Sequence, residues 1–218
     1  MISISELLID QRLPGNYFAT DIYVKGDLEL GLLENRRGDR LLALPSTLLQ
    51  GIYSGLDKET GLASRMVLFN CGRWWGKNFY ARFCEELTDY YHTAVADMSM
   101  VEFIQCIQQC WITHGWGKIE LDRTYQDQGF LVIQIQNSPF ASQAPKDNKP
   151  ACFLEAGALS SFFSQLTGRD LHCIQTTCES MSKDCNQFVL GLTKRIQSIE
   201  EMVARGMEHD AIMQKICE

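Results

Sequence analysis

The pattern of apolar and polar positions in the N-terminal half predicts short strands followed by helices. Apolar side chains alternate loosely with polar ones from Tyr17 to Leu33, which predicts strands turning near Gly26-Asp27. Farther along, apolar residues recur at helical spacing. Ser99 precedes Glu102 by three positions, a capping-box pattern that marks a helix start. The predicted helices span residues 45–54, 58–71, 73–92 and 99–113.

The C-terminal half predicts a β-hairpin, a helix and two more strands. The pattern changes at Gly115-Trp116-Gly117, after which two alternating runs flank a turn at 127–129. A later apolar helix is closed by Thr167-Gly168. The predicted elements are strands 118–123 and 130–136, helix 152–166, strands 171–176 and 186–192, and an amphipathic helix over 193–218 interrupted near Gly206.

These elements predict an α+β fold, with several helices packed on a small antiparallel sheet. We expect a lead-in over residues 1–16, a domain over 17–192 and a C-terminal amphipathic helix over 193–218. The apolar stripe of that helix, Ile196 to Ile216, can face a partner protein or lie back on its own domain.

Composition narrows the class of protein. The 218 residues are 45% apolar and 22% charged, which is typical of a globular chain. Twenty basic and 27 acidic residues give a net charge of −7, which disfavours nucleic-acid binding. No apolar run reaches the roughly 20 residues of a membrane span, and no signal peptide is evident. We therefore expect a soluble, cytoplasmic protein.

Common catalytic signatures are absent from the sequence. It contains no phosphate loop, no dinucleotide fingerprint, no zinc-protease motif and no nucleophile elbow. Nine cysteines is a high and odd number, and a disulfide scaffold is not expected in a chain without an export signal. No catalytic residues are therefore predicted.

The stretch from Pro150 to Gly191 resembles the 4-vinyl reductase domain family, named for bacteriochlorophyll 4-vinyl reductase. The residues that carry the resemblance are Pro150-Ala151-Cys152-Phe153, Gly157, Gly168-Arg169, Cys178 and Cys185-Asn186-Gln187-Phe188. Upstream, Gly115-Trp116-Gly117 and Asn137-Ser138-Pro139-Phe140 also look like this family. The resemblance extends over about residues 15–192 and is most specific between Cys178 and Phe188.

The resemblance implies a zinc site, because several family members bind zinc. Carried over to this chain, the ligands are Cys152, Cys178 and Cys185, with Gln175 where the family has Glu. Three thiolates and a fourth ligand would make a closed, structural site. Gln is a poor zinc ligand, and the Cys178–Cys185 turn is one residue shorter than the family pattern. Cys173 as fourth ligand, or a metal-free cysteine cluster, are the alternatives.

The resemblance also implies a fold similar to transport-particle subunits, nitric-oxide-associated sensor domains and the aromatic-effector domains of phenol-sensing activators. These folds place a hydrophobic pocket between long helices and a sheet. An aromatic lining suits a flat, apolar ligand, although a packed core is the simpler interpretation of each ring. Because Trp74 and Trp75 are adjacent on a helix, both rings cannot face one core. The predicted ligand-binding residues are Trp74, Phe79, Phe83, Phe103, Trp111 and Trp116.

Three functions follow as hypotheses. The first is a non-catalytic sensor or carrier with an apolar ligand, for which the family implies a tetrapyrrole and a role in pigment biosynthesis or photosynthetic complex assembly. The second is a scaffold or interaction protein acting as a homodimer. The third, a tetrapyrrole vinyl reductase, rests on the family name alone, because the sequence has no nucleotide-binding fingerprint.

Overall fold

The computed structural model describes residues 13–142, 144 and 149–218. Residues 1–12 of the expected lead-in over 1–16 lie outside the described residues. In chain order the main elements are α2 (Thr20–Tyr23), β1 (Lys25–Asp27), β2 (Leu32–Glu34), β3 (Arg40–Leu41), α3 (Ser46–Thr60), α4 (Ala63–Tyr91), α5 (Met100–Thr113), β4 (Lys118–Asp122), β5 (Phe130–Gln136), α6 (Pro139–Ser142), α7 (Phe153–Thr167), β6 (Leu171–Thr177), β7 (Asn186–Leu192), α8 (Thr193–Ala204) and α9 (His209–Cys217). Short 3-10 turns lie at Val95–Asp97, Gln126–Gln128 and Glu179–Met181.

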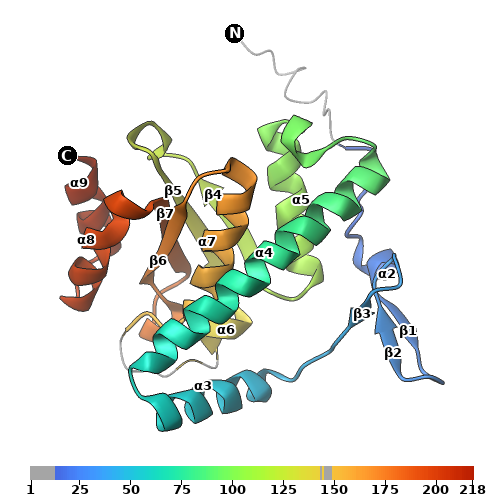
Figure 1. The fold of residues 1–218 in the computed structure, drawn as a ribbon, viewed down its shortest axis with the longest axis horizontal. Coiled ribbons are helices and arrows are strands. Elements are labelled where there is room, and N and C mark those ends of the chain that lie inside the picture. The colour runs from blue at the N-terminus through green and yellow to red at the C-terminus, as the bar shows by residue number, and fades with distance from the viewer. Residues whose placement is uncertain (1–12, 143, 145–148) are drawn as a thin grey trace.

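The expected α+β architecture is confirmed. An antiparallel sheet of order β4-β5-β7-β6 carries α7 and the long α4 on one face and α8 with α9 on the other (Figure 1). A second small antiparallel sheet, of order β1-β2-β3, lies apart from the first near α2. Among the described residues, no helix is both long and apolar enough to cross a membrane.

Strand alternation divides the core into two clusters, one on each face of the larger sheet. Phe188 and Leu190 of β7 belong to the main core with α4, α5 and α7, whereas Val189 packs in the cluster formed with α8 and α9. Ile196 and Ile199 of α8 are fully buried there. Burial of each such side chain contributes roughly 1.5–3 kcal/mol. The apolar stripe of the C-terminal segment therefore lies back on its own sheet.

Several predicted boundaries are confirmed. Ser99 caps α5 in a complete capping box, in which its hydroxyl accepts from the Glu102 amide and the Glu102 carboxylate accepts from the Ser99 amide. Gly168 closes α7 in the left-handed region, with φ of 64°. The predicted hairpin forms from β4 and β5, and α8 and α9 are separated near Gly206.

The N-terminal region differs from the expectation. The chain forms a short helix, α2, before β1, and the turn between β1 and β2 lies after Gly26-Asp27 rather than at them. Gly26 itself pairs with Leu33 inside the ladder. Tyr17, Phe18 and Tyr23 of this region are buried in the main core. Burial of these rings, rather than local alternation, decides the structure here.

Residues 58–60 of the predicted helix 58–71 belong to the end of α3, and residues 63–71 join the predicted helix 73–92 in the single helix α4. The two predicted ranges leave out Gly72, a residue type that weakens a helix interior. In the structure Gly72 and Gly76 lie on the face of α4 that crosses α7 (Figure 1). A Cβ at Gly72 would overlap the carbonyl oxygen of Leu154, and one at Gly157 of α7 would overlap that of Phe69. The glycines thus permit close helix packing instead of ending a helix.

Candidate functional site

Five of the six predicted ligand-binding residues meet in one aromatic cluster inside the main core. Phe79 of α4 is the hub, with its ring centroid 5.8 Å from that of Trp111 and 5.2 Å from that of Trp116. The Phe83 and Phe103 rings lie 6.3 Å apart on the inner side. Phe162 of α7, Trp75 and His114 complete the cluster, although the sequence analysis did not select them as ligand residues. We call these eight residues the aromatic cluster.

Trp111 carries a polar group that the cluster leaves without a partner. Its side chain is only 3% exposed, and its indole Nε1 has no hydrogen-bond partner among the described residues. A buried donor without an acceptor costs about 1–3 kcal/mol. Such a group in an apolar cluster is a natural anchor for one acceptor atom of a ligand.

The cluster reaches the surface at the turn between α5 and β4. Trp116 is half-buried there and stacks on His114, with centroids 4.4 Å apart. Gly115 and Gly117 on either side have φ of 69° and 99°, a backbone that side chains rarely adopt. The Trp116 ring therefore covers the buried Trp111 from a tight glycine turn, and the two centroids are 5.3 Å apart.

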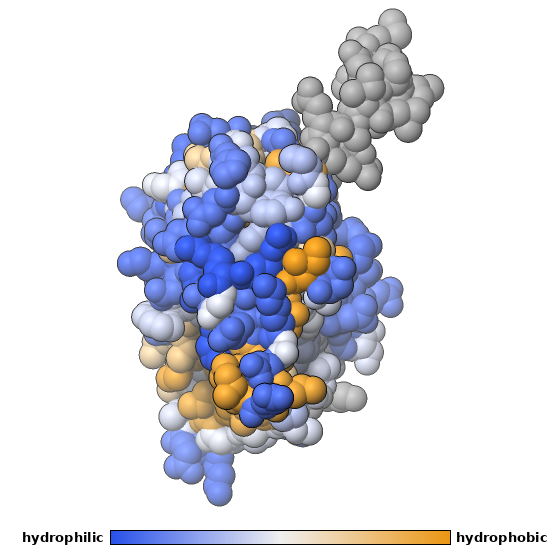
Figure 2. Space-filling model, turned by 90° about the vertical axis from the view of Figure 1, so that its right-hand side faces the viewer, coloured by the Kyte–Doolittle hydropathy of each residue, from blue (hydrophilic) through white to orange (hydrophobic). Residues whose placement is uncertain are grey.

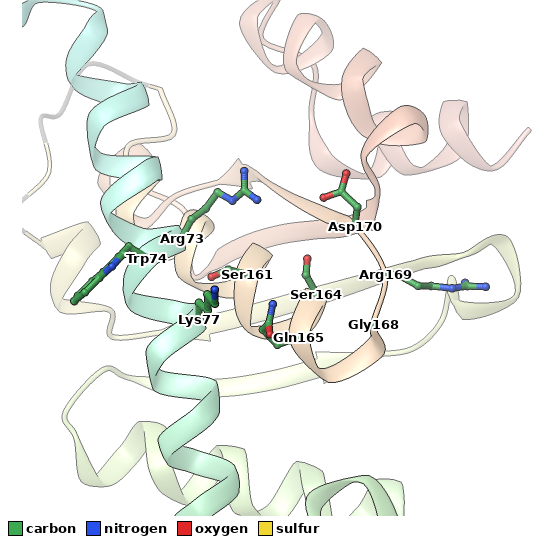
Figure 3. Close-up of a pocket in the computed structure, with 9 residues that line it drawn as sticks. All are labelled: Arg73, Trp74, Lys77, Ser161, Ser164, Gln165, Gly168, Arg169 and Asp170. Carbon is green, nitrogen blue, oxygen red and sulfur yellow. The ribbon is translucent and has the colours of Figure 1, made fainter.

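Trp74 does not join the cluster. Its side chain is 73% exposed, and Trp75 instead contacts Trp116. Trp74 borders an open hollow of about 580 Å³ between α4 and the end of α7 (Figure 3). Arg73 and Asp170 point toward each other across this hollow, while the Trp74 ring points away from it. The one predicted ligand residue at a surface hollow thus sits in a polar setting.

A buried polar network adjoins the cluster. The His114 Nδ1 lies 2.8 Å from the Cys110 carbonyl, which can only accept, so Nδ1 carries the proton. Its Nε2 is 3.4 Å from the Tyr23 hydroxyl, which also lies 3.5 Å from Glu86. Burial lowers the pKa of His114, so the imidazole is neutral. The Asn35 amide donates to the Glu86 carboxyl at 2.8 Å.

Burial raises the pKa of Glu86 from 4.5 to about 7, which predicts a pH-dependent stability. Between these values the unfolded chain ionises Glu86 while the folded chain keeps it protonated, so stability falls as pH rises through this window. We expect Glu86→Gln to remove a fall on the order of 3 kcal/mol, at about 1.4 kcal/mol per pKa unit. Urea unfolding at pH 5 and pH 8 measures the difference.

The matched control is Glu85→Gln, since Glu85 is the exposed neighbour that pairs with Arg37. This substitution should leave the pH dependence of unfolding as in the wild type. Equal pH slopes in Glu86→Gln and wild-type protein would show that Glu86 ionises normally in the folded chain.

Two of the predicted zinc ligands lie together. Cys152 at the start of α7 and Cys178 after β6 are fully buried, and their sulfur atoms are 3.7 Å apart. The Ser180 hydroxyl also donates to the Cys178 sulfur at 3.0 Å. Hydrogen bonds, first that from Cys152 and then those from Ser180, lower the pKa of Cys178 to about 6 against the opposing effect of burial. The pKa of Cys152 is raised because its proton is shared with Cys178.

Gln175, the fourth predicted ligand, is engaged in amide hydrogen bonds. Its Oε1 accepts from the Cys152 backbone amide at 2.8 Å, and its Nε2 donates to Asn186 Oδ1 at 3.2 Å. Asn186 in turn donates to the Ile135 carbonyl and to Glu179. The sequence analysis did not select Asn186, although strand alternation places it on the same face as Phe188.

Cys185 does not complete a zinc site in this arrangement. It lies in the bend before β7 and is half-buried, in contrast to the fully buried Cys152 and Cys178. Among the described residues, no group of three or more His, Cys, Asp or Glu side chains is placed to hold a metal ion. Two thiols and two amides that already bond one another do not fit the tetrahedral thiolate site that zinc requires. Zinc binding by Cys152, Cys178, Cys185 and Gln175 stays a prediction that this geometry does not support.

One part of the chain matches the model of a known family. Residues 131–192, from β5 to the end of β7, match the model of the 4-vinyl reductase domain. The matched segment contains Cys152, Gln175, Cys178 and Cys185, so the resemblance to the 4-vinyl reductase family is confirmed where it was most specific. No curated protein sequence matches the chain.

Two solved structures show the same fold at low sequence identity. The phenol-responsive sensory domain of the transcription activator PoxR, solved with phenol, aligns with a TM-score of 0.64 at 11% identity, covering 86% of this chain and 94% of that one. A trafficking protein particle complex subunit 3 from Naegleria fowleri, covalently bound to palmitic acid, aligns with a TM-score of 0.52 at 14% identity, covering 68% and 95%. A vinyl-4-reductase family protein from Methanocaldococcus jannaschii gives 0.44 at 15% identity, covering 69% and 82%.

Proposed function

From the 4-vinyl reductase domain match at residues 131–192 and the fold shared with a phenol-responsive sensory domain, we propose that this chain is a non-catalytic small-molecule-binding domain, a sensor or carrier. Its ligand is an apolar ring compound held in the aromatic cluster. The observation that carries the proposal is the buried, unpartnered indole N–H of Trp111. It supplies one directed hydrogen bond within an apolar, aromatic surrounding, which is the usual composition of a small-molecule site.

The geometry also indicates how a ligand enters. The rings of the cluster touch one another, so a guest ring must displace one of them. Trp116 is the ring we assign to this movement, because it is half-buried and held on a turn between two glycines. A ligand ring that takes its place meets Phe79 and Trp111, which are each within 6 Å of it in centroid distance. An acceptor atom on that ring then pairs with the Trp111 indole.

Ring size separates two classes of ligand. Displacement of one indole makes room for a single or fused ring, and this favours a phenol-like compound. The family resemblance implies the larger tetrapyrrole, and the proposed link to pigment biosynthesis or photosynthetic complex assembly depends on that ligand. Binding of a tetrapyrrole would require more rings to move than Trp116.

The test is calorimetric titration of the full chain with phenol, with toluene and with a soluble porphyrin. Toluene has the shape of phenol and lacks the acceptor. We expect Trp111→Phe to weaken phenol binding about tenfold, which is the effect of one buried hydrogen bond, and to leave toluene binding nearly unchanged. Trp74→Phe, outside the cluster, is the matched control and should bind phenol as the wild type does.

If Trp111→Phe weakens phenol binding and toluene binding equally, the Trp111 indole does not donate a hydrogen bond to the ligand. If only the porphyrin binds, the ligand class is a tetrapyrrole and the proposal of a single-ring ligand is wrong. If none of the three compounds binds, the small-molecule proposal is wrong for ring ligands.

One observation favours a second function, that of a homodimeric interaction protein. An exposed apolar strip follows the segment before α3 and the outer face of α3, and it consists of Leu42, Leu44, Leu48 and Ile52. Figure 2 shows apolar patches among polar residues on the side of the molecule that carries the small sheet. Exposed apolar strips of this kind are typical of interfaces. Light scattering of the wild type and of Ile52→Lys tests the alternative, since a dimer that uses the strip becomes monomeric in the variant.

A further inference from the structure

Because the cysteine cluster does not fit zinc, the thiols of Cys152 and Cys178 are free to react with each other. The Cys152 and Cys178 sulfur atoms are 3.7 Å apart, and a disulfide bond requires approach to about 2.05 Å. Cys152 begins α7, and Cys178 lies between the end of β6 and the turn at Glu179–Met181. Bond formation therefore requires the two sulfur atoms to approach by about 1.7 Å.

The polar groups around the pair prepare Cys178 to react first. The Ser180 hydroxyl donates to its sulfur at 3.0 Å, and the Cys152 thiol lies on its other side. Gln175 and Asn186 are hydrogen-bonded to each other, and Gln175 also accepts from the Cys152 backbone amide, so they fix the start of α7 beside the pair. The positions of both sulfur atoms are thus set by the surrounding structure.

A surface hollow leads toward this site. The hollow has a volume of about 400 Å³ and is lined by Asn137, Ser138, Pro139, Ala141, Ser142, Glu179 and Ser180. Ser180 therefore connects the hollow to the sulfur atom of Cys178, to which it is hydrogen-bonded. A molecule as small as hydrogen peroxide that enters the hollow is one side chain away from Cys178.

We propose that Cys152 and Cys178 form a disulfide under oxidation by a peroxide, so that this metal-free pair is a redox modification site. The Cys178 sulfur attacks one oxygen of hydrogen peroxide, the O–O bond breaks, and the other oxygen leaves as water after taking up a proton. The Cys152 sulfur then attacks the resulting sulfenic sulfur, the S–O bond breaks, and water leaves with the Cys152 proton. Two thiols are oxidised by two electrons, and one peroxide is reduced to two waters.

The disulfide would join the first turn of α7 to the end of β6. At this end the two elements otherwise meet through packing and through the Gln175 hydrogen bond, whereas hydrogen bonds of Ser160 and Ser164 to Leu171 join their opposite ends. The aromatic cluster lies elsewhere in the core, so the modification does not depend on the proposed ligand.

The experiment treats the full, reduced chain with hydrogen peroxide, removes the peroxide, and unfolds the chain in denaturant that contains N-ethylmaleimide, so that every remaining thiol is blocked before disulfides are mapped by mass spectrometry. The expected main product is an intramolecular link between Cys152 and Cys178. No Lys or Arg separates Cys173 from Cys178, so both occur in one tryptic peptide. The variant Cys173→Ala should keep the link, and Cys178→Ser should lose it.

Exposed Cys71 reports that the oxidant acted. Oxidised Cys71 in a wild-type chain whose Cys152 and Cys178 remain alkylatable thiols would overturn the proposal, and this result needs no variant that folds. Zinc added to the reduced chain provides the second readout. Tight binding of zinc to the wild type that is lost in Cys178→Ser would also overturn it, because the pair would then belong to a metal site.

Discussion

Gly72→Ala is expected to lower the free energy of unfolding by about 3 kcal/mol. The new Cβ would overlap the Leu154 carbonyl oxygen and lie 2.9 Å from the Ala158 amide nitrogen, both backbone atoms that no rotamer change can move. Helix α4 must therefore separate from α7, and overpacking of this kind costs about 1–3 kcal/mol or more. For a chain of this length, thermal denaturation should show a melting temperature lower by roughly 6–12 °C.

Gly51→Ala in α3 is the matched control. Gly51 is also inside a helix, and nothing lies within 4 Å of the Cβ that alanine would add. The free energy of unfolding should rise by about 0.5–1 kcal/mol, because alanine favours the helix. Similar behaviour of the two variants would contradict the close crossing of α4 and α7.

Phe162→Ala is expected to lower the free energy of unfolding by about 3–5 kcal/mol, as a large core ring is lost. The Phe162 side chain is only 1% exposed, and its ring lies 5.4 Å from Phe79 and 5.5 Å from Phe83 in centroid distance. The space that it leaves is next to the proposed ligand site. A ring compound should therefore raise the melting temperature of this variant more than that of the wild type.

Phe153→Ala, on the same helix, is the control that separates a general loss of stability from a gain of ligand binding. Phe153 is half-buried, and its ring is covered by Arg65 outside the aromatic cluster. Its loss should cost less stability, and phenol should stabilise this variant no more than the wild type. If phenol fails to stabilise Phe162→Ala beyond the wild type, the ligand does not bind beside Phe162.

Local sequence signals predicted the elements whose ends are set by local chemistry. The capping box of Ser99 and Glu102 marks the start of α5, and Gly168 ends α7 in the left-handed region. The alternating runs on either side of the turn at 127–129 indicated the hairpin that β4 and β5 form. In each case a single residue or its near neighbours determine the outcome.

Features that depend on distant packing were not predictable in this way. The predicted helices 58–71 and 73–92 leave out Gly72, and only its contact with α7 explains why α4 continues through it. Adjacent Trp74 and Trp75 could be recognised as one inward and one outward ring, but their order depends on the rotation of α4 against the core. The sequence motif likewise named Cys185 as a ligand, while the shorter turn places Asn186 at the Cys152 side of β7.

The most direct measurement of the central claim is the two-dimensional ¹⁵N–¹H spectrum of the tryptophan side chains during titration with phenol. The chain has four tryptophans, so the indole signals can be assigned with single Trp→Phe variants. The account predicts that the Trp111 indole proton shifts and exchanges more slowly as it gains an acceptor, while the Trp74 signal stays in place. An unchanged Trp111 signal at saturating phenol, with movement at Trp74 instead, would place the ligand at the surface and contradict the account.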